Sequence, residues 1–165
     1  MQNNQLEDIT SKEFLDTALR NAANWCKGNL HKHLEGFNNG IDYSIFSYVV
    51  NNELIGPDMC LDEKKPGLIM VSTDKLFWYK QKEVYFKEIG MRRYALVERK
   101  PVNIIGAVEV DPESMFVHEI VEFILSKDAE TFFHYFSKLE FPHDIAYQIE
   151  NINRLERGLK PWPEY

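Results

Sequence analysis

The stretch MFVHEIVEFIL, residues 115–125, contains the side chains whose types and spacing come nearest to chemistry. His118 and Glu122 stand four positions apart, and Glu119 directly follows the histidine. On an α-helix this spacing puts two side chains about 6 Å apart on one face, close enough to share a metal ion. On a β-strand the same spacing covers about 13 Å, which is too far for one ion. The secondary structure of this stretch therefore decides whether it can belong to a metal-dependent hydrolase.

Two structures compete for residues 115–125. Asp111 followed by Pro112 is a good start signal for a helix, because Asp caps helices and proline suits the first helical position. The same pair also suits a turn that leads into a strand. The many β-branched and aromatic residues favour a strand. We therefore predict a strand, with a helix as the alternative, and the strand carries on one face Met115, Val117, Val121, Phe123 and Leu125.

The other histidines do not complete a metal site by their spacing. The segment HKH at 31–33 puts two histidines on different faces of a helix. Glu140 and His143 have the spacing of a helical pair, but Pro142 between them breaks the helix that the pair needs. A zinc-protease helix would also carry a second histidine where Glu122 stands. We therefore predict no metal site, no catalytic residues and no cofactor.

The remaining signals point away from an enzyme and from a membrane. Cys26 and Cys60 have no metal-ligand spacing and form no disulfide framework, so we predict two reduced thiols. The chain contains neither a glycine-rich nucleotide motif nor a nucleophile elbow. Its N-terminus is polar, and no apolar run is long enough for a signal peptide or a transmembrane segment. These features predict a cytoplasmic protein that is not an enzyme.

Charge is unevenly distributed along this acidic chain, whose net charge is −7. Residues 64–100 hold 10 Lys and Arg against 4 Asp and Glu, whereas both flanking segments are acidic. Such a protein should repel nucleic acid as a whole and still hold an anionic group at its basic segment. The candidate ligand-binding residues of that segment are Lys75, Lys80, Lys82, Lys87, Arg92 and Arg93.

The chain begins with a helix and continues with short strands. Thr10 and Glu13 of TSKE form a capping box, and apolar residues then recur at helical spacing, which predicts one amphipathic helix over about 11–35. The β-branched and aromatic runs that follow predict an antiparallel meander, because turn residues separate them. These runs cover residues 43–50, 67–72, 75–80, 83–89, 93–99 and 102–110.

Helical patterns return near the C-terminus. Residues from Ser126 or Asp128 onward start a helix whose inward face holds Phe132, Phe133 and Phe136. A last helix runs from Pro142, which suits the first helical position, to Gly158. The final KPWPEY is predicted to be an extended tail that lays Trp162 on the surface.

Two segments resemble a known family. GLIMVSTDKLFWY, residues 67–79, is similar to the hairpin of bacterial PH-like and GRAM-type domains, with Ser72 where threonine is usual. VEFILSKDAETFFHYFSKL, residues 121–139, is similar to the final strand, short turn and capping helix of that family. The resemblance covers about 65–140. It implies an antiparallel PH-like β-barrel that a helix plugs, with basic residues on its early strands that hold anionic headgroups.

We therefore predict a single α+β domain over residues 1–165. Its core is an antiparallel PH-like β-barrel or strongly bent sheet, with a long N-terminal helix and two C-terminal helices. The N-terminal helix occupies 1–40, the strand-rich core with its capping helix 43–140, and the C-terminal helix and tail 142–165.

Three hypotheses for function come from different classes. The first is a non-catalytic binding module that contacts a protein partner or an anionic surface such as lipid. The second is a small acidic immunity or inhibitor protein that neutralises a toxin or nuclease, as its size and acidic flanks suggest. The third is a metal-dependent hydrolase that uses His118 and Glu122. The sequence leaves the oligomeric state open.

Overall fold

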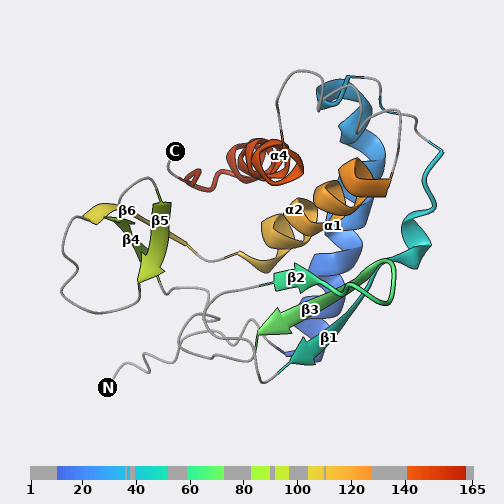
Figure 1. The fold of residues 1–165 in the computed structure, drawn as a ribbon, viewed down its shortest axis with the longest axis horizontal. Helices are drawn as coiled ribbons and strands as arrows, with labels where there is room; N and C mark the ends of the chain where they lie inside the picture. The colour runs from blue at the N-terminus through green and yellow to red at the C-terminus, as the bar shows by residue number, and fades with distance from the viewer. Residues whose placement is uncertain are drawn as a thin grey trace.

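Three helices and two small sheets make up the described part of the computed structural model (Figure 1). The structure describes residues 11–35, 37, 40–51, 59–72, 83–89, 92–96, 104–109, 111–127 and 141–162, and for the second sheet it describes the backbone. The helices are α1 (Lys12–His33), α2 (Pro112–Lys127) and α4 (Pro142–Glu156). Helix α2 packs against both α1 and α4. None of the helices in these ranges combines the length and apolar character that crossing a membrane requires.

Helix α1 confirms the predicted N-terminal helix and its buried apolar face. The side chain of Ser11 accepts a hydrogen bond of 3.2 Å from the Phe14 amide, so Ser11 is the N-cap. The predicted cap, Thr10, is therefore wrong by one residue, and Thr10 itself lies outside the described residues. The buried side chains recur at three- and four-residue spacing, as an amphipathic helix requires. They are Leu15, Ala18, Ala22, Cys26 and Leu30.

The first sheet contains β1 (Ser47–Asn51), β2 (Met59–Leu61) and β3 (Leu68–Ser72), in the order β1-β3-β2. A short 3-10 helix, Tyr43–Ile45, leads into β1. Strand β1 runs parallel to β3, and β2 runs antiparallel to it. Ile69 and Val71 of β3 are fully buried and join Met59 and Phe46 in the helical core. The sheet therefore buries one face against the helices.

The second sheet contains β4 (Glu83–Ile89), β5 (Arg92–Leu96) and β6 (Ile104–Glu109), in the order β5-β4-β6. Both pairings are antiparallel. Figure 1 shows this sheet beside the helical part, away from β1, β2 and β3. These strands confirm the strands predicted near 83–89, 93–99 and 102–110, but they form a separate sheet.

The predicted antiparallel PH-like barrel is wrong. The described strands form two open three-stranded sheets, and the first of them is mixed. A parallel pair needs a crossover connection, so β1 and β3 cannot be neighbours in a meander. The strand that would close the barrel is also missing from its predicted place, because residues 115–125 are helical. The predicted helix with Phe132, Phe133 and Phe136 lies outside the described residues, as does the strand at 75–80.

Helix α2 replaces the strand predicted at 115–125. Asp111 caps it, because its carboxylate accepts a 2.9 Å hydrogen bond from the Ser114 amide, and Pro112 is the first helical residue. The helix is buried on most sides, against α1, α4 and the first sheet. A helix surrounded by protein needs apolar residues all round, so it loses the amphipathic period that marks surface helices. Burial therefore explains its Val- and Ile-rich, strand-like composition.

Helix α4 confirms the predicted last helix, with Pro142 at its start. It ends in a Schellman motif, in which the Leu159 amide donates to the Arg154 carbonyl and the Gly158 amide to the Leu155 carbonyl. Gly158 takes the left-handed conformation that this turn requires, with φ of 76°. The turn sends the chain back along α4, and Trp162 becomes buried there. The predicted exposed position of Trp162 is therefore wrong.

Two glycines with positive φ should respond differently to alanine. We expect Gly158→Ala to cost about 1 kcal/mol, the ordinary cost of left-handed backbone for a residue with a Cβ. A Cβ there meets nothing within 4 Å, whereas a Cβ on Gly67 would lie 2.7 Å from the Ile45 carbonyl oxygen. Gly67→Ala should therefore cost clearly more than Gly158→Ala in urea unfolding. Equal costs would contradict the close packing of the turn before β3 against Ile45.

Candidate metal centre

Helices α2 and α4 meet along a seam of polar side chains. From one pair to the next, the residue number rises along α2 and the residue number of the partner falls along α4, so the two helices run antiparallel. Each pair is joined by a hydrogen bond or an ion pair. The four pairs are Asp111 with Arg157, Ser114 with Arg154, His118 with Glu150, and Glu122 with His143.

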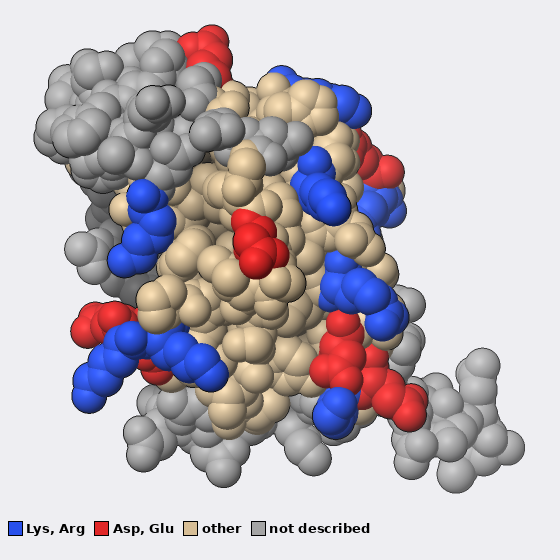
Figure 2. Space-filling model, turned by 90° about the vertical axis from the view of Figure 1, so that its right-hand side faces the viewer, with Lys and Arg blue, Asp and Glu red and all other residues tan. Residues whose placement is uncertain are grey.

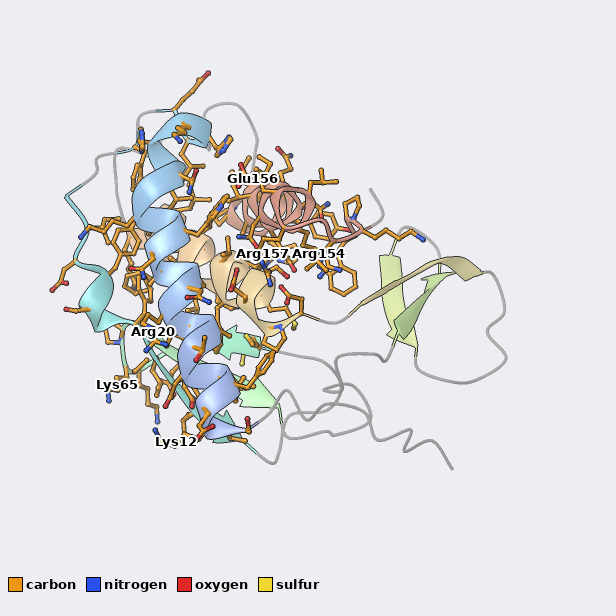
Figure 3. All side chains as sticks on the ribbon, turned by 180° about the vertical axis from the view of Figure 1, so that it is seen from behind. Lys12, Arg20, Lys65, Arg154, Glu156 and Arg157 are labelled. Atoms are coloured by element: carbon orange, nitrogen blue, oxygen red, sulfur yellow. The ribbon has the colours of Figure 1, made fainter. Side chains whose placement is uncertain are left out.

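One end of the seam is held by arginines. Arg157 donates two hydrogen bonds to the Asp111 carboxylate, of 2.5 and 3.1 Å, and contacts Glu113 at 2.8 Å. Burial opposes ionisation of Asp111, but the Arg157 guanidinium outweighs it and keeps the pKa of that carboxyl below its ordinary value. Arg154 is fully buried and donates to Ser114. Figure 3 shows Arg154 and Arg157 together where α4 faces α2.

His118 lies at the middle of the seam and is buried together with its partner. Its Nδ1 is 2.9 Å from Oε1 of Glu150, and the two residues are only 8% and 4% exposed. The second carboxylate oxygen of Glu150 accepts a 2.5 Å hydrogen bond from the indole N–H of Trp162. With both of its oxygens engaged, Glu150 holds the His118 ring in one orientation.

The opposite nitrogen of His118 belongs to a cluster of three possible metal ligands. Its Nε2 lies 3.2 Å from Nδ1 of His143 and 3.4 Å from Oε2 of Glu122. Nδ1 of His143 lies 3.2 Å from Oε1 of Glu122. The side chain of His143 is 54% exposed, so the cluster reaches the surface at that side. Two histidines and one carboxylate thus converge from two helices.

No placement of protons on the two histidines makes all three contacts of this cluster favourable. An ionised Glu122 accepts from His118 only if Nε2 carries a proton, and from His143 only if Nδ1 carries one. The two N–H groups would then face each other across the 3.2 Å that separates Nε2 from Nδ1. A cation between the three groups removes this conflict, because each of them then offers a lone pair.

Protonation of His118 is strongly favoured while the site holds no metal. Burial opposes the charged ring, but hydrogen bonds to Glu122 and Glu150 outweigh it and raise the pKa of His118 to about 10. Burial likewise opposes the charge of Glu122, and the hydrogen bonds from His118 and His143 lower its pKa to about 2. Glu122 is therefore ionised at neutral pH, as a metal ligand must be.

Sequence reasoning found two of these residues and missed two. The strand predicted at 115–125 excludes His118 and Glu122 as ligands of one ion, and that strand prediction is wrong because the stretch is helical. Pro142 does break the helix before it, but it also starts α4 and so places His143 in its first turn. Neither His143 nor Glu150 is tied to His118 by any sequence spacing. Only the antiparallel packing of α2 and α4 brings them together.

The structure describes no side chain of the predicted ligand-binding residues. Lys75, Lys80 and Lys82 lie outside the described residues. Lys87 is on β4, and Arg92 and Arg93 are on β5, where the structure describes the backbone. Figure 2 shows that, on the face it presents, described basic and acidic residues are scattered among other residues. Anion binding by the basic segment stays a prediction.

Two surface grooves are described, and neither reaches the cluster. Both run along α1 and residues 41–50, with Asp16, Leu19 and Tyr48 in their walls. Neither cysteine forms a disulfide, and burial raises the pKa of the Cys26 thiol, which makes it unreactive. Among the described residues, the group around His118 is therefore the best candidate for a functional site.

Comparisons with known proteins add no identification. No family model matches the chain, and neither the curated proteins nor the solved structures contain a match. The case for a function therefore depends on the geometry around His118.

The unfolding free energy of the metal-free protein should depend on His118 at alkaline pH. Because folding raises its pKa from the ordinary 6.5 to about 10, protonated His118 stabilises the fold fully below pH 6.5. This stabilisation should be lost as pH rises toward 10. Urea unfolding of chelator-treated protein between pH 6 and 10 measures it.

His118→Asn keeps a donor near Glu150 but does not titrate, so the variant should lack this decline. His31→Gln, a change at an exposed histidine outside the seam, should keep it. Parallel pH profiles for the wild type and His118→Asn would show that His118 gains no proton from folding.

Proposed function

We propose that the protein binds a divalent transition-metal ion through His118, Glu122 and His143. The observation that carries this proposal is the convergence of the three groups: Nε2 of His118 lies 3.2 Å from Nδ1 of His143, and these nitrogens lie 3.4 and 3.2 Å from the two carboxylate oxygens of Glu122, Oε2 and Oε1 respectively. A tetrahedral zinc site with metal–ligand distances of about 2.0–2.1 Å has ligands about 3.3 Å apart. With one donor atom taken from each residue, the three atoms lie within 4.8 Å of one another, so a small rotation of the Glu122 carboxylate would bring all three to the spacing of such an ion.

The donor types narrow the choice of metal. Imidazole nitrogens suit zinc, copper, iron and nickel, whereas calcium and magnesium prefer sites made of oxygen ligands. Two histidines with one carboxylate therefore favour zinc or a neighbouring first-row metal. Glu150 supplies the outer support that ligating histidines need, because its carboxylate holds Nδ1 of His118 and leaves Nε2 for the ion.

Metal and proton compete for the same atom of His118. The raised pKa of the ring means that an incoming ion must displace the Nε2 proton at neutral pH. Binding should therefore weaken as pH falls. The hydrogen bond from Nδ1 to Glu150 can persist, since a ligating histidine keeps its other proton.

The reaction class that such a centre supports is metal-dependent hydrolysis. Catalytic zinc sites take three ligands from the protein and hold a water molecule at the fourth position. The described residues supply three donors, and the half-exposed His143 gives the cluster its contact with solvent. A metal of this kind would supply an acidified water as nucleophile. We accordingly favour the metal-dependent hydrolase of His118 and Glu122, with His143 as the third ligand.

The other functional hypotheses keep their original basis. A binding module for a protein partner or anionic lipid rests on the basic segment, and an immunity or inhibitor protein rests on the acidic flanks. The cytoplasmic location likewise remains a prediction of the sequence. No observation among the described residues favours any of these over metal binding.

Zinc uptake tests the proposed function directly. Protein stripped with chelator and then titrated with zinc against a chromophoric competitor should take up one ion per chain. His143→Ala should abolish this uptake with little effect on folding, because the side chain it removes is half exposed.

His31→Ala, a change at an exposed histidine on α1, is the matched control and should bind zinc like the wild type. A wild type that takes up no zinc would overturn the proposal. Full uptake by His143→Ala would show that the ion binds elsewhere.

A further inference from the structure

We infer that Trp162 is a positioning residue of the metal centre and that the C-terminal strap, residues 158–162, sets its metal affinity. The inference rests on the proposed function. It follows from a chain of contacts in which the indole N–H of Trp162 donates to Glu150 and the other oxygen of Glu150 contacts His118. Through Glu150 the strap thereby acts on the His118 ring at Nδ1, on the side opposite to Nε2, which is the atom that would bind the ion.

The C-terminal strap is attached firmly enough to hold Trp162 in place. The Trp162 amide donates to the side chain of Asn151 at 2.8 Å, and the Asn151 amide group donates to the Trp162 carbonyl at 3.1 Å. Arg154 donates to the Lys160 carbonyl, and its guanidinium lies 4.6 Å from the centre of the indole ring. These contacts fix both the backbone and the ring of Trp162.

The hydrogen bond from Trp162 to Glu150 limits the orientations that the His118 ring can adopt. A carboxylate free to rotate could turn away from His118, and the imidazole could then adopt other orientations or the other tautomer. The indole N–H occupies one oxygen of Glu150, so the remaining oxygen faces Nδ1 of His118. Nδ1 keeps its proton, and Nε2 points at His143 and Glu122. Outer contacts of this kind typically change metal affinity by about 10- to 100-fold.

A second tryptophan, Trp25 of α1, offers a matched control. Trp25 also donates its indole N–H to a glutamate of α4, Glu156, at 2.7 Å. Figure 3 labels Glu156 on α4 beside α1. Glu156 lies six residues beyond Glu150, at the end of α4 where Arg157 pairs with Asp111. Trp25→Phe therefore removes the same kind of bond without touching the metal centre.

The experiment compares the zinc dissociation constants of stripped wild type, Trp162→Phe and Trp25→Phe by competition with a chelator. Trp162→Phe should weaken zinc binding about tenfold, and Trp25→Phe should leave it unchanged. The visible spectrum of the cobalt-loaded protein should shift in Trp162→Phe alone, because ligand orientation alters it and a general loss of stability does not.

A double-mutant cycle separates positioning from packing. In Glu150→Gln the new amide N–H group opposes the indole N–H, so the amide turns its oxygen to Trp162 and its nitrogen to His118. Zinc binding should fall. Adding Trp162→Phe frees the amide to turn back, so the double variant should bind zinc better than Glu150→Gln alone. A packing role would make the double variant worse.

The outcomes separate the two proposals. If the wild type binds no zinc, the proposed function fails and the inference fails with it. If the wild type binds zinc but Trp162→Phe and Trp25→Phe match it, the inference alone is overturned. Should Trp162→Phe not fold, a tryptophan analogue with sulfur in place of the N–H, introduced at position 162, keeps the ring shape and tests the same bond.

Discussion

The buried contact between His118 and Glu150 constrains how α2 and α4 lie against each other. Two polar groups that are almost fully removed from water must keep their partners, because an unpaired buried charge is costly. Asp111 with Arg157 fixes one end of the same seam, and Glu122 with His143 the other. A shift of one helix by one turn, about 5.4 Å, would break these pairs together. The apolar core allows many helix registers, but this seam selects one.

The same register creates the candidate metal centre. Because α4 runs antiparallel to α2, its first turn lies beside the second half of α2, and His143 meets Glu122 and His118. Glu150 lies two turns further along α4 and supports His118 from behind. The Schellman turn at Gly158 then returns the chain along α4, which brings Trp162 to Glu150. Structural support and ligand placement are thus parts of one arrangement.

The sequence predicts α1 and α4 correctly, because each of these helices has one face in the core and the other in water. α1 and α4 carry helical periodicity with start signals in TSKE, residues 10–13, and at Pro142. The strand at 83–89 has clear β-forming residues. α2 escapes prediction because it is buried on most sides, so its Val and Ile residues show no helical period and suggest a strand. The barrel prediction failed with it. His143 and Glu150 could not be assigned from sequence, since their relation to His118 exists only through helix packing.

The central claim is that His118, Glu122 and His143 share one metal ion, and anomalous diffraction from zinc-grown crystals tests it most directly. The account predicts a single strong peak at the zinc absorption edge, about 2.0–2.2 Å from Nε2 of His118, Nδ1 of His143 and a carboxylate oxygen of Glu122. The hydrogen bond from Nδ1 of His118 to Glu150 should persist in that structure. A map with no peak between these three residues, at a zinc concentration that occupies other sites, would contradict the account.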